Sequence, residues 1–380
     1  MREGWTYKKL GELATFINGY PFKPSDWKDC GRRIIRIQNL NNPKALYNYY
    51  DGDIDAKYLV SNGDVLISWS GSLGVFEWSE DEAILNQHIF KVVFNKGDIN
   101  KRFFEYVVSS RINEMTTKVH GITMQHITKR DFDVIPIPIP PLSEQQRIVN
   151  ELDLLSSIIE KKKAQLKEYD QLAQSIFYDM FGDPIENPKG WEVKKLGEVC
   201  KKITDGTHDT PQRLEKGVKF ITGKHIRPFL VDYDNSDYVT EEVHKEIFQR
   251  CNPELGDVLY TNIGAGIGNA AINTVEYEFS MKNVALLKPL RSIVNGYFLE
   301  FYLNNDKIKT IIIDNYSNGG AQKFLSLKSI AKIPVSLPPL SLQQSFASKI
   351  EAIERQKALV QQSITETETL FNSRMDYWFS

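Results

Sequence analysis

The chain has 380 residues, of which 41% are hydrophobic and 25% are charged. This length exceeds one average domain, so we expect two globular units, and the composition excludes a disordered chain or one made only of coiled coil. Lys and Arg number 47 against 49 for Asp and Glu, a net charge of -2, which excludes nucleic-acid binding through bulk positive charge but allows a local basic face.

The first residues and the cysteines indicate a cellular location. Residues 1–10 lack the apolar core and cleavage site of a signal peptide. No apolar run approaches the roughly 20 residues of a membrane span. The three cysteines Cys30, Cys200 and Cys251 are too widely spaced for a metal-binding pair, so we expect reduced thiols. The sequence therefore predicts a soluble, cytoplasmic protein that does not associate with membranes.

In chain order, the first half predicts a mixed domain followed by a long helix. Short strands are expected at 34–37, 65–68 and 89–94, and a helix around 101–110. Prolines then alternate with isoleucines over 135–141, which forbids a helix and predicts an edge strand. A capping box between Ser143 and Gln146 is expected to begin a long helix, and Gly182 and Pro184 are expected to end it.

The second half predicts the same order of elements. Strands are expected at 219–222, 258–261 and 284–288, a helix at 296–304, and a long helix from 340 to the end of the chain. A second capping box links Ser341 to Gln344.

Four sequence matches show that the two halves are one module written twice. The segments GWTYKKLGE, GDVL, SGSLG and PPLSEQQ begin at 4, 63, 70 and 140, and their counterparts GWEVKKLGE, GDVL, GAGIG and PPLSLQQ begin at 190, 256, 264 and 338. Matches in the same order along the chain identify an internal repeat.

The long helices carry apolar residues at heptad a and d positions. In the first helix these are Leu152, Leu155, Ile159, Leu166, Tyr169, Ala173, Ile176 and Met180, with Lys162 as the exception. In the second they are Ile350, Ile353, Val360, Ile364, Phe371 and Trp378, with Lys357, Thr367 and Arg374 as exceptions. Such a seam requires a partner, and we expect the helices to pair as an antiparallel coiled coil. The alternative is that each helix folds back onto its own domain.

The chain offers no convincing catalytic, cofactor or metal motif. The glycines of 264–268 follow GxGxG spacing, which differs from a dinucleotide fingerprint, and no phosphate-loop lysine follows them. The six histidines form no metal-ligand spacing. We therefore expect no catalytic residue, no cofactor and no metal.

Polar loop residues instead suggest recognition of DNA bases. Gln and Asn pair bidentately with adenine, and Arg or Lys with guanine. In the first half the candidates are Arg36, Gln38, Asn39, Ser68, Ser70, Asn86, Gln87, His88, Thr123 and Gln125. In the second half they are Thr222, Lys224, His225, Thr261, Asn262, Lys282, Asn283 and Lys323. The halves share their framework but differ at these positions, as expected if one scaffold presents two specificities.

These motifs resemble the specificity (S) subunits of type I restriction–modification systems. The resemblance covers nearly the whole chain in order: the GWxxKKLGE openings, the GDVL segments, the PPLSxQQ exits and the paired helices. PPLSEQQRIV from Pro140 is the most specific element, and the second copy departs from it at Leu342, Ser345 and Phe346.

The resemblance implies a domain organisation and a set of partners. It implies an α+β chain in which 1–141 and 190–339 are target-recognition domains, 142–181 and 340–380 are spacer helices, and 182–189 is a linker. Each domain would recognise half of a bipartite target in double-stranded DNA. Two methyltransferase (M) subunits would dock on the helices, and endonuclease/translocase (R) subunits would join them. Adenine methylation and DNA cleavage would belong to the complex and not to this chain.

Two other functional classes remain open from the sequence. A scaffold or adaptor would use the same helices without any DNA sequence preference. A bilobed enzyme would need convergent catalytic groups between its domains, and binding of S-adenosylmethionine or a nucleotide by the chain alone would favour it.

Overall fold

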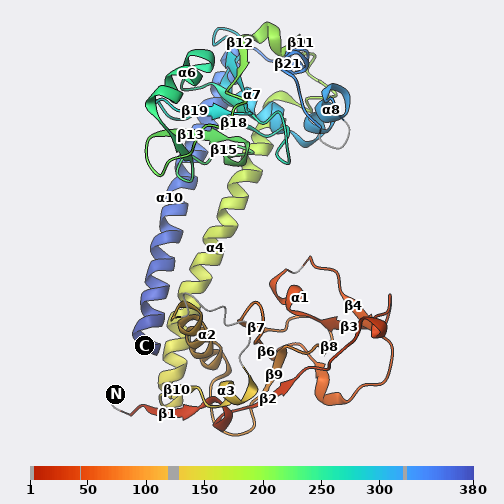
Figure 1. The fold of residues 1–380 in the computed structure, drawn as a ribbon, viewed down its shortest axis with the longest axis vertical. Helices are drawn as coiled ribbons and strands as arrows, with labels where there is room; N and C mark the ends of the chain where they lie inside the picture. Colours follow the sequence, from red (N-terminus) through yellow and green to blue (C-terminus); the bar gives the residue numbers. More distant parts are fainter. Residues whose placement is uncertain (1–3, 43, 119–127, 320–322) are drawn as a thin grey trace. The chain divides into compact units, whose positions relative to one another are not determined.

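A computed structural model describes residues 4–42, 44–118, 128–319 and 323–380 (Figure 1). The chain forms two compact units, Met1–Lys163 with Gln362–Ser380, and Ala164–Gln361. Each unit therefore contains one copy of the repeated domain together with a segment of each long helix.

The first unit is built from two four-stranded sheets and a two-stranded one. One sheet has the order β2-β9-β6-β7, the second has β4-β3-β8-β5, and β1 pairs with β10. The strands are β1 (Thr6–Lys9), β2 (Thr15–Asn18), β3 (Arg32–Ile35), β4 (Asn48–Tyr50), β5 (Leu59–Val60), β6 (Val65–Ser68), β7 (Gly74–Glu77), β8 (Ala83–Leu85), β9 (Ile89–Val93) and β10 (Pro136–Ile139). The helices are α1 (Ile37–Asn41), α2 (Lys101–Lys118), α3 (Lys129–Asp133) and the long α4 (Leu142–Phe181), which continues into the second unit.

The second unit repeats this plan. The sheet β12-β20-β17-β18 corresponds to β2-β9-β6-β7, the sheet β16-β13-β19 corresponds to β4-β3-β8, and β11 pairs with β21. The strands are β11 (Glu192–Lys195), β12 (Cys200–Asp205), β13 (Val218–Thr222), β14 (Ile226–Arg227), β15 (Leu230–Val231), β16 (Asp237–Val239), β17 (Val258–Tyr260), β18 (Ala270–Ile272), β19 (Ser280–Lys282), β20 (Ala285–Pro289) and β21 (Pro334–Leu337). The helices are α5 (Leu196–Val199), α6 (Glu241–Cys251), α7 (Gly296–Asn304), α8 (Asp306–Tyr316), α9 (Leu327–Ile330) and α10 (Leu340–Phe379).

The elements expected from the sequence are found; most of their ends agree within one residue, and two elements differ more. The strand expected at 34–37 ends at Ile35, and α1 begins at Ile37 because the Asn39 side chain accepts the Arg36 N–H at 3.1 Å and turns the chain. The helix expected around 101–110 continues to Lys118. The proline-rich segment forms β10, which is held by β1 from the start of the chain, and the glycine-rich segments connect the antiparallel pairs β6/β7 and β17/β18.

The GDVL motifs begin equivalent strands through the same turn. Gly63 and Gly256 have φ values of +87° and +85°, a left-handed conformation that favours glycine. The following carboxylates cap the turn: Asp64 accepts the Ser61 N–H at 2.7 Å, and Asp257 accepts the Glu254 N–H at 2.9 Å. The shared geometry of this turn therefore explains why both copies carry the glycine and the aspartate.

The expected capping boxes at the long helices are wrong. The helices begin at Leu142 and Leu340, within the expected bounds, so Ser143 and Ser341 lie inside them and not at their N-caps. The Gln146 side chain bonds Asn100 and Asn150 instead of the helix start. The carbonyl of the proline before each helix accepts the N–H groups of the third and fourth helical residues, so the helical hydrogen bonds already begin ahead of each serine.

The first glutamine of each QQ pair is instead the structural residue. Gln145 donates to the Pro140 carbonyl at 2.9 Å and accepts the Asn100 N–H at 2.8 Å. Gln343 makes the same bonds with Pro338, at 2.8 Å, and with the Asn295 N–H, at 2.9 Å. Both glutamines are fully buried. Each one joins the start of a long helix to the start of the helix that packs beside it, α2 or α7.

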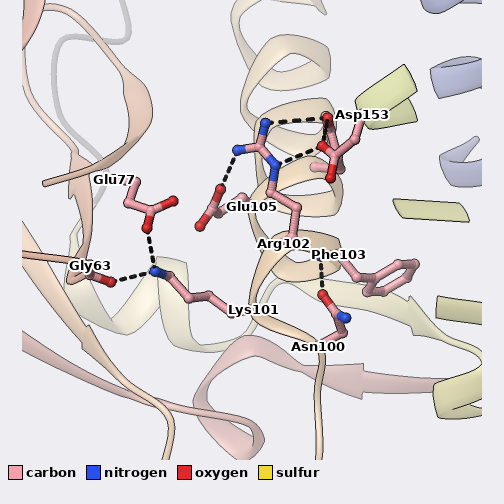
Figure 2. A network of polar contacts seen from close by, with 9 residues as sticks. Gly63, Glu77, Asn100, Lys101, Arg102, Phe103, Glu105 and Asp153 are labelled. Atoms are coloured by element: carbon pink, nitrogen blue, oxygen red, sulfur yellow. Dashed lines mark hydrogen bonds and ion pairs between the residues drawn. The ribbon is translucent and has the colours of Figure 1, made fainter. Parts of the chain in front are cut away.

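A charged network also joins α2 to the surrounding elements of the first unit (Figure 2). The Arg102 guanidinium bonds Asp153 of α4 at 2.9 Å and the buried Glu105 at 2.6 Å. The Lys101 ammonium lies 2.9 Å from the Glu77 carboxylate and also bonds the Gly63 carbonyl of the GDVL turn. The N-terminal turn of α2 therefore fixes both a long helix and a strand hairpin.

The two long helices pair in antiparallel orientation, as the seam predicted (Figure 1). Every seam position named above is buried or partly buried. The sequence pattern missed Phe177, Phe181, Met375 and Phe379, which are also buried and pack against the adjoining domains. The seam is therefore wider near the helix ends than a strict heptad predicts.

Each polar exception in the seam has a partner on the opposite helix. In the second unit the Lys357 ammonium lies 2.9 Å from Asp170. In the first unit the Lys162 ammonium bonds Ser363, and the Arg374 guanidinium bonds the Glu151 carboxylate, with Nη2 to Oε2 at 3.2 Å. Polar groups at a and d positions select one register over others at some cost in stability.

Candidate nucleic-acid interface

Parallel strand pairing brings several candidates of the first half to one edge. Strands β3 and β8 run parallel, so the residues that follow them, Arg36 and Asn86, leave the sheet on the same side. The Asn86 N–H donates to the Ile35 carbonyl at 3.2 Å, which fixes their proximity. Gln87 and His88 continue from Asn86, and the ring of His88 lies 4.9 Å from that of Trp69, which follows β6.

The second half repeats this arrangement with different side chains. Strands β13 and β19 are parallel, and Thr222 is directly paired with Lys282. A cavity of about 380 Å³ opens at this edge. Five of the expected residues line it: Thr222, Lys224, Thr261, Lys282 and Asn283. The structure thus brings together side chains that are separated by about sixty residues of chain.

Arg213 also lines this cavity, although it was not among the residues expected from the sequence. Its guanidinium and the Lys224 ammonium both bind one oxygen of Asp237, at 2.9 and 3.0 Å. The Lys282 ammonium bonds the hydroxyl of Thr210. The lining is therefore rich in cationic donors, and Asp237 holds two of them side by side.

At the equivalent place in the first half lies Arg36. Arg36 donates to the side-chain oxygen of Asn48 at 3.0 Å, and its guanidinium lies 5.0 Å from the centre of the Trp27 ring. The pairing of Ile34 with Asn48 and of Phe220 with Asp237 makes Asn48 the counterpart of Asp237. The two halves therefore share a backbone arrangement at this edge but present different polar side chains.

Asn39 and His225 have structural roles in the two halves. The Asn39 side chain accepts the Arg36 N–H and donates to the carbonyls of Ala45 and Leu46, both at 3.3 Å. His225 Nδ1 accepts the Thr222 N–H at 2.9 Å, and burial lowers the pKa of its imidazole. Both side chains are buried. Both side chains hold the neighbouring loop through hydrogen bonds to the backbone.

The other candidates lie in several environments. Gln38 is exposed on α1, whereas Ser68 and Ser70 are buried, and Ser68 bonds the Ser72 carbonyl within the β6–β7 connection. Asn262 lines a second cavity of about 270 Å³ that shares Asn283 with the first. The Lys323 ammonium lies 3.5 Å from Asp314. Thr123 and Gln125 lie outside the described residues.

Two glycines that the sequence analysis missed shape these edges. A Cβ on Gly19 would lie 2.0 Å from the Asn86 carbonyl oxygen, and one on Gly206 would lie 1.8 Å from the Met281 oxygen. Neither position admits a side chain. The dipeptides Asn18-Gly19 and Asp205-Gly206 were the available signal, since such pairs mark sharp turns.

Comparison with known proteins decides the family. The sequence profile described as "Type I restriction modification DNA specificity domain" matches residues 2–168 and again 188–369. The chain belongs to this family. The resemblance drawn from its motifs is confirmed, and one copy of the family domain lies in each half.

The sequences of individual relatives align with this type I specificity chain along most of its length. It is 23% identical to the Escherichia coli EcoBI specificity subunit, over 93% of this chain and 80% of the relative. It is 26% identical to a putative type I specificity subunit of Haemophilus influenzae, over 92% and 87%.

Solved structures agree with the fold of this specificity chain. The S subunit from M. genitalium matches with a TM-score of 0.57 at 16% identity, over 99% of this chain and 96% of that one. A structure from work on assembly of the type I R-M system matches with a TM-score of 0.58 at 18% identity, over 99% and 97%. Among the residues described, no helix is long and apolar enough to cross a membrane.

Proposed function

We propose that this specificity chain recognises a bipartite DNA target, with one half-site bound by each copy of the domain. The convergence of Thr222, Lys224, Thr261, Lys282 and Asn283 on one cavity supports this most directly, because their positions had been selected from sequence as DNA contacts. Arg36 and Asn86 are proposed to serve the first half. Both sets lie at the same edge of equivalent parallel strands, as expected of one scaffold with two specificities.

The chemistry is proposed to belong to partner subunits. Two methyltransferase subunits would dock on the α4–α10 pair and methylate adenine, and endonuclease/translocase subunits would join that core. Relatives named as specificity subunits of restriction enzymes support this assignment. The complex would act on cytoplasmic DNA.

Exchange of one domain tests the proposal. Replacing residues 190–339 by the corresponding segment of a relative should change one half of the methylated sequence and leave the other half intact. The sequence is measured by mapping methylated adenines in DNA from cells that contain the complex. A change in both halves, or in neither, would contradict two independent recognition domains. Binding of the complex to DNA with no sequence preference would favour the alternative that the chain is a scaffold or adaptor.

The helix pair is proposed to set the distance between the half-sites. Four residues inserted after Lys163 and four after Gln361 lie opposite each other, next to the bond between Lys162 and Ser363. They add about 6 Å at about 1.5 Å per residue and nearly one full turn, so the seam stays nearly in phase.

The expected result is a spacer longer by one or two base pairs, at about 3.4 Å for each. Four residues inserted after Glu186, in the linker, provide the control and should leave the spacer unchanged. The original spacer from an active complex with lengthened helices would show that the helices do not set the distance.

A further inference from the structure

The cavity beside β13 and β19 differs from a surface that recognises base edges. Its side-chain nitrogens belong to Arg213, Lys224, Lys282 and Asn283, and its remaining polar side chains are the hydroxyls of Thr222 and Thr261. The side-chain oxygen of Asn283 lies 3.0 Å from His208 Nδ1 and is already engaged. The lining therefore offers chiefly hydrogen-bond donors and positive charge.

The charge in the cavity is only partly compensated. Asp237 is shared by Arg213 and Lys224 through one oxygen, so two cations face one carboxylate. Their side chains remain 46% and 55% exposed, whereas that of Asp237 is only 23% exposed. Within the described residues, the Lys282 ammonium bonds a neutral hydroxyl and no carboxylate. An anion that enters the cavity would meet an excess of positive charge.

One wall of the cavity is backbone with little side-chain cover. It consists of Gly264, Ala265 and Gly266, which connect β17 to β18. Gly264 has φ +88°, and no atom lies within 4 Å of the place where its Cβ would stand. An incoming group can therefore approach the main chain closely, as in the concave backbone sites that bind anions.

We propose that this cavity binds a phosphate group of the DNA backbone, so that Arg213, Lys224 and Lys282 set affinity and position and do not select a base. This rests on the proposed recognition of DNA by the second domain. Bases other than guanine present a donor or a methyl group in the major groove, which such a lining does not match. Guanine presents two acceptors, but a phosphate projects from the duplex and fits a concave site.

The test uses the complete complex with its methyltransferase subunits and the variants R213Q, K224Q and K282Q. DNA affinity is measured against salt concentration on a duplex that carries the mapped target sequence. Each variant should reduce the slope of log affinity against log salt by up to about 0.9, the value for one phosphate contact. The methylated sequence should stay unchanged. The control is K245Q, a change of an exposed lysine on α6, which should leave the slope as it is.

Three results would overturn the proposal. If a variant methylates sequences with a relaxed base at one position, its cation recognises that base. If the slope is unchanged in all three variants, the cavity does not hold a backbone phosphate. If inorganic phosphate at constant ionic strength binds the wild-type complex but not K282Q, and the slopes are equal, the cavity serves a free anion. Failure of the bipartite model itself would appear separately, as a wild-type methylated sequence without two half-sites.

Discussion

The helices α2 and α7 occupy the same place in the two halves but treat a buried glutamate differently. Both begin after a capping asparagine, Asn100 or Asn295, and both carry a buried glutamate five residues later. Glu105 pairs with Arg102 at 2.6 Å, whereas Tyr297 stands in the place of that arginine beside Glu300. Burial raises the pKa of Glu300 to about 8, and its carboxyl accepts the Ile272 N–H at 2.8 Å.

The comparison shows that one backbone position supports either a charged or a neutral acid. The first half stabilises the charge with an arginine that also reaches α4, and the second half keeps the proton on the carboxyl near neutral pH. The repeat therefore conserves the packing of this helix and not its electrostatics.

The sheet edges that carry the proposed DNA contacts also differ between the two halves. In the first half the Trp69 indole follows β6 and donates to the Asn18 side chain at 3.2 Å. Its counterpart Asn262 lines a cavity beside Asp205, the counterpart of Asn18. The equivalent strands β6 and β17 are thus followed by an indole that bonds strand β2 in one half and by an asparagine that lines a cavity in the other.

The largest effect is expected when the buried glutamine that both halves share is replaced. Gln145→Ala and Gln343→Ala each leave a buried N–H and a proline carbonyl without their partner, so each should lower the free energy of unfolding by about 3 kcal/mol. Denaturant unfolding of the full chain measures this loss. Gln344→Ala is the matched control, because the second glutamine of that pair is exposed, and its effect should stay below about 0.5 kcal/mol. Equal effects at both glutamines would contradict the structural role of the buried one.

Loss of the arginine beside Glu105 should cost more stability than loss of the Glu300 carboxyl. Arg102→Met leaves Glu105 buried without its cation and should cost about 2 kcal/mol, less than for a fully buried pair because the arginine side chain is 44% exposed. Glu300→Gln keeps the acceptor for Ile272 and avoids the proton uptake that folding requires of Glu300 at pH 7, so it should cost no stability at that pH. A larger loss in Glu300→Gln than in Arg102→Met would contradict the assigned protonation states.

Glu300 also predicts a pH dependence. A carboxyl whose folded pKa, about 8, lies above its ordinary value of 4.5 binds its proton more tightly in the folded state. Its contribution to stability is fully present below about pH 4.5 and is lost as the pH rises through the folded pKa. Wild-type protein should therefore lose roughly 1 kcal/mol per pH unit between pH 6 and 8 relative to Glu300→Gln. Parallel stability curves for the two proteins would show that Glu300 is ionised when folded.

A smaller effect than that of the buried glutamines is expected at the two loop caps. Asn39→Ala and His225→Ala each remove the acceptor of one backbone N–H and should cost about 1 kcal/mol. Both variants should methylate the same sequence as the wild type. A changed half-site in a variant that remains folded would make the residue a base contact, as the sequence first suggested.

The sequence by itself determined the repeat, the two long helices and their apolar seam. These features are local or periodic, since a heptad, a proline run or a repeated GDVL turn is visible among neighbouring residues. It also determined the family, through motifs that proved to be structural: the Asp64 turn and the buried Gln145 keep the fold of each copy.

The tertiary structure alone decided which polar residues meet. Thr222 and Lys282 become neighbours only because β13 pairs in parallel with β19, and no local pattern in the chain specifies that pairing. The bridge between Leu214 and Tyr238 and the ion pair with Asp237 bring Arg213 into the site, and the turn after β13 places His225 in the interior. Polar loop residues look alike in sequence, and only the backbone groups around them decide whether a side chain caps a turn or faces a ligand.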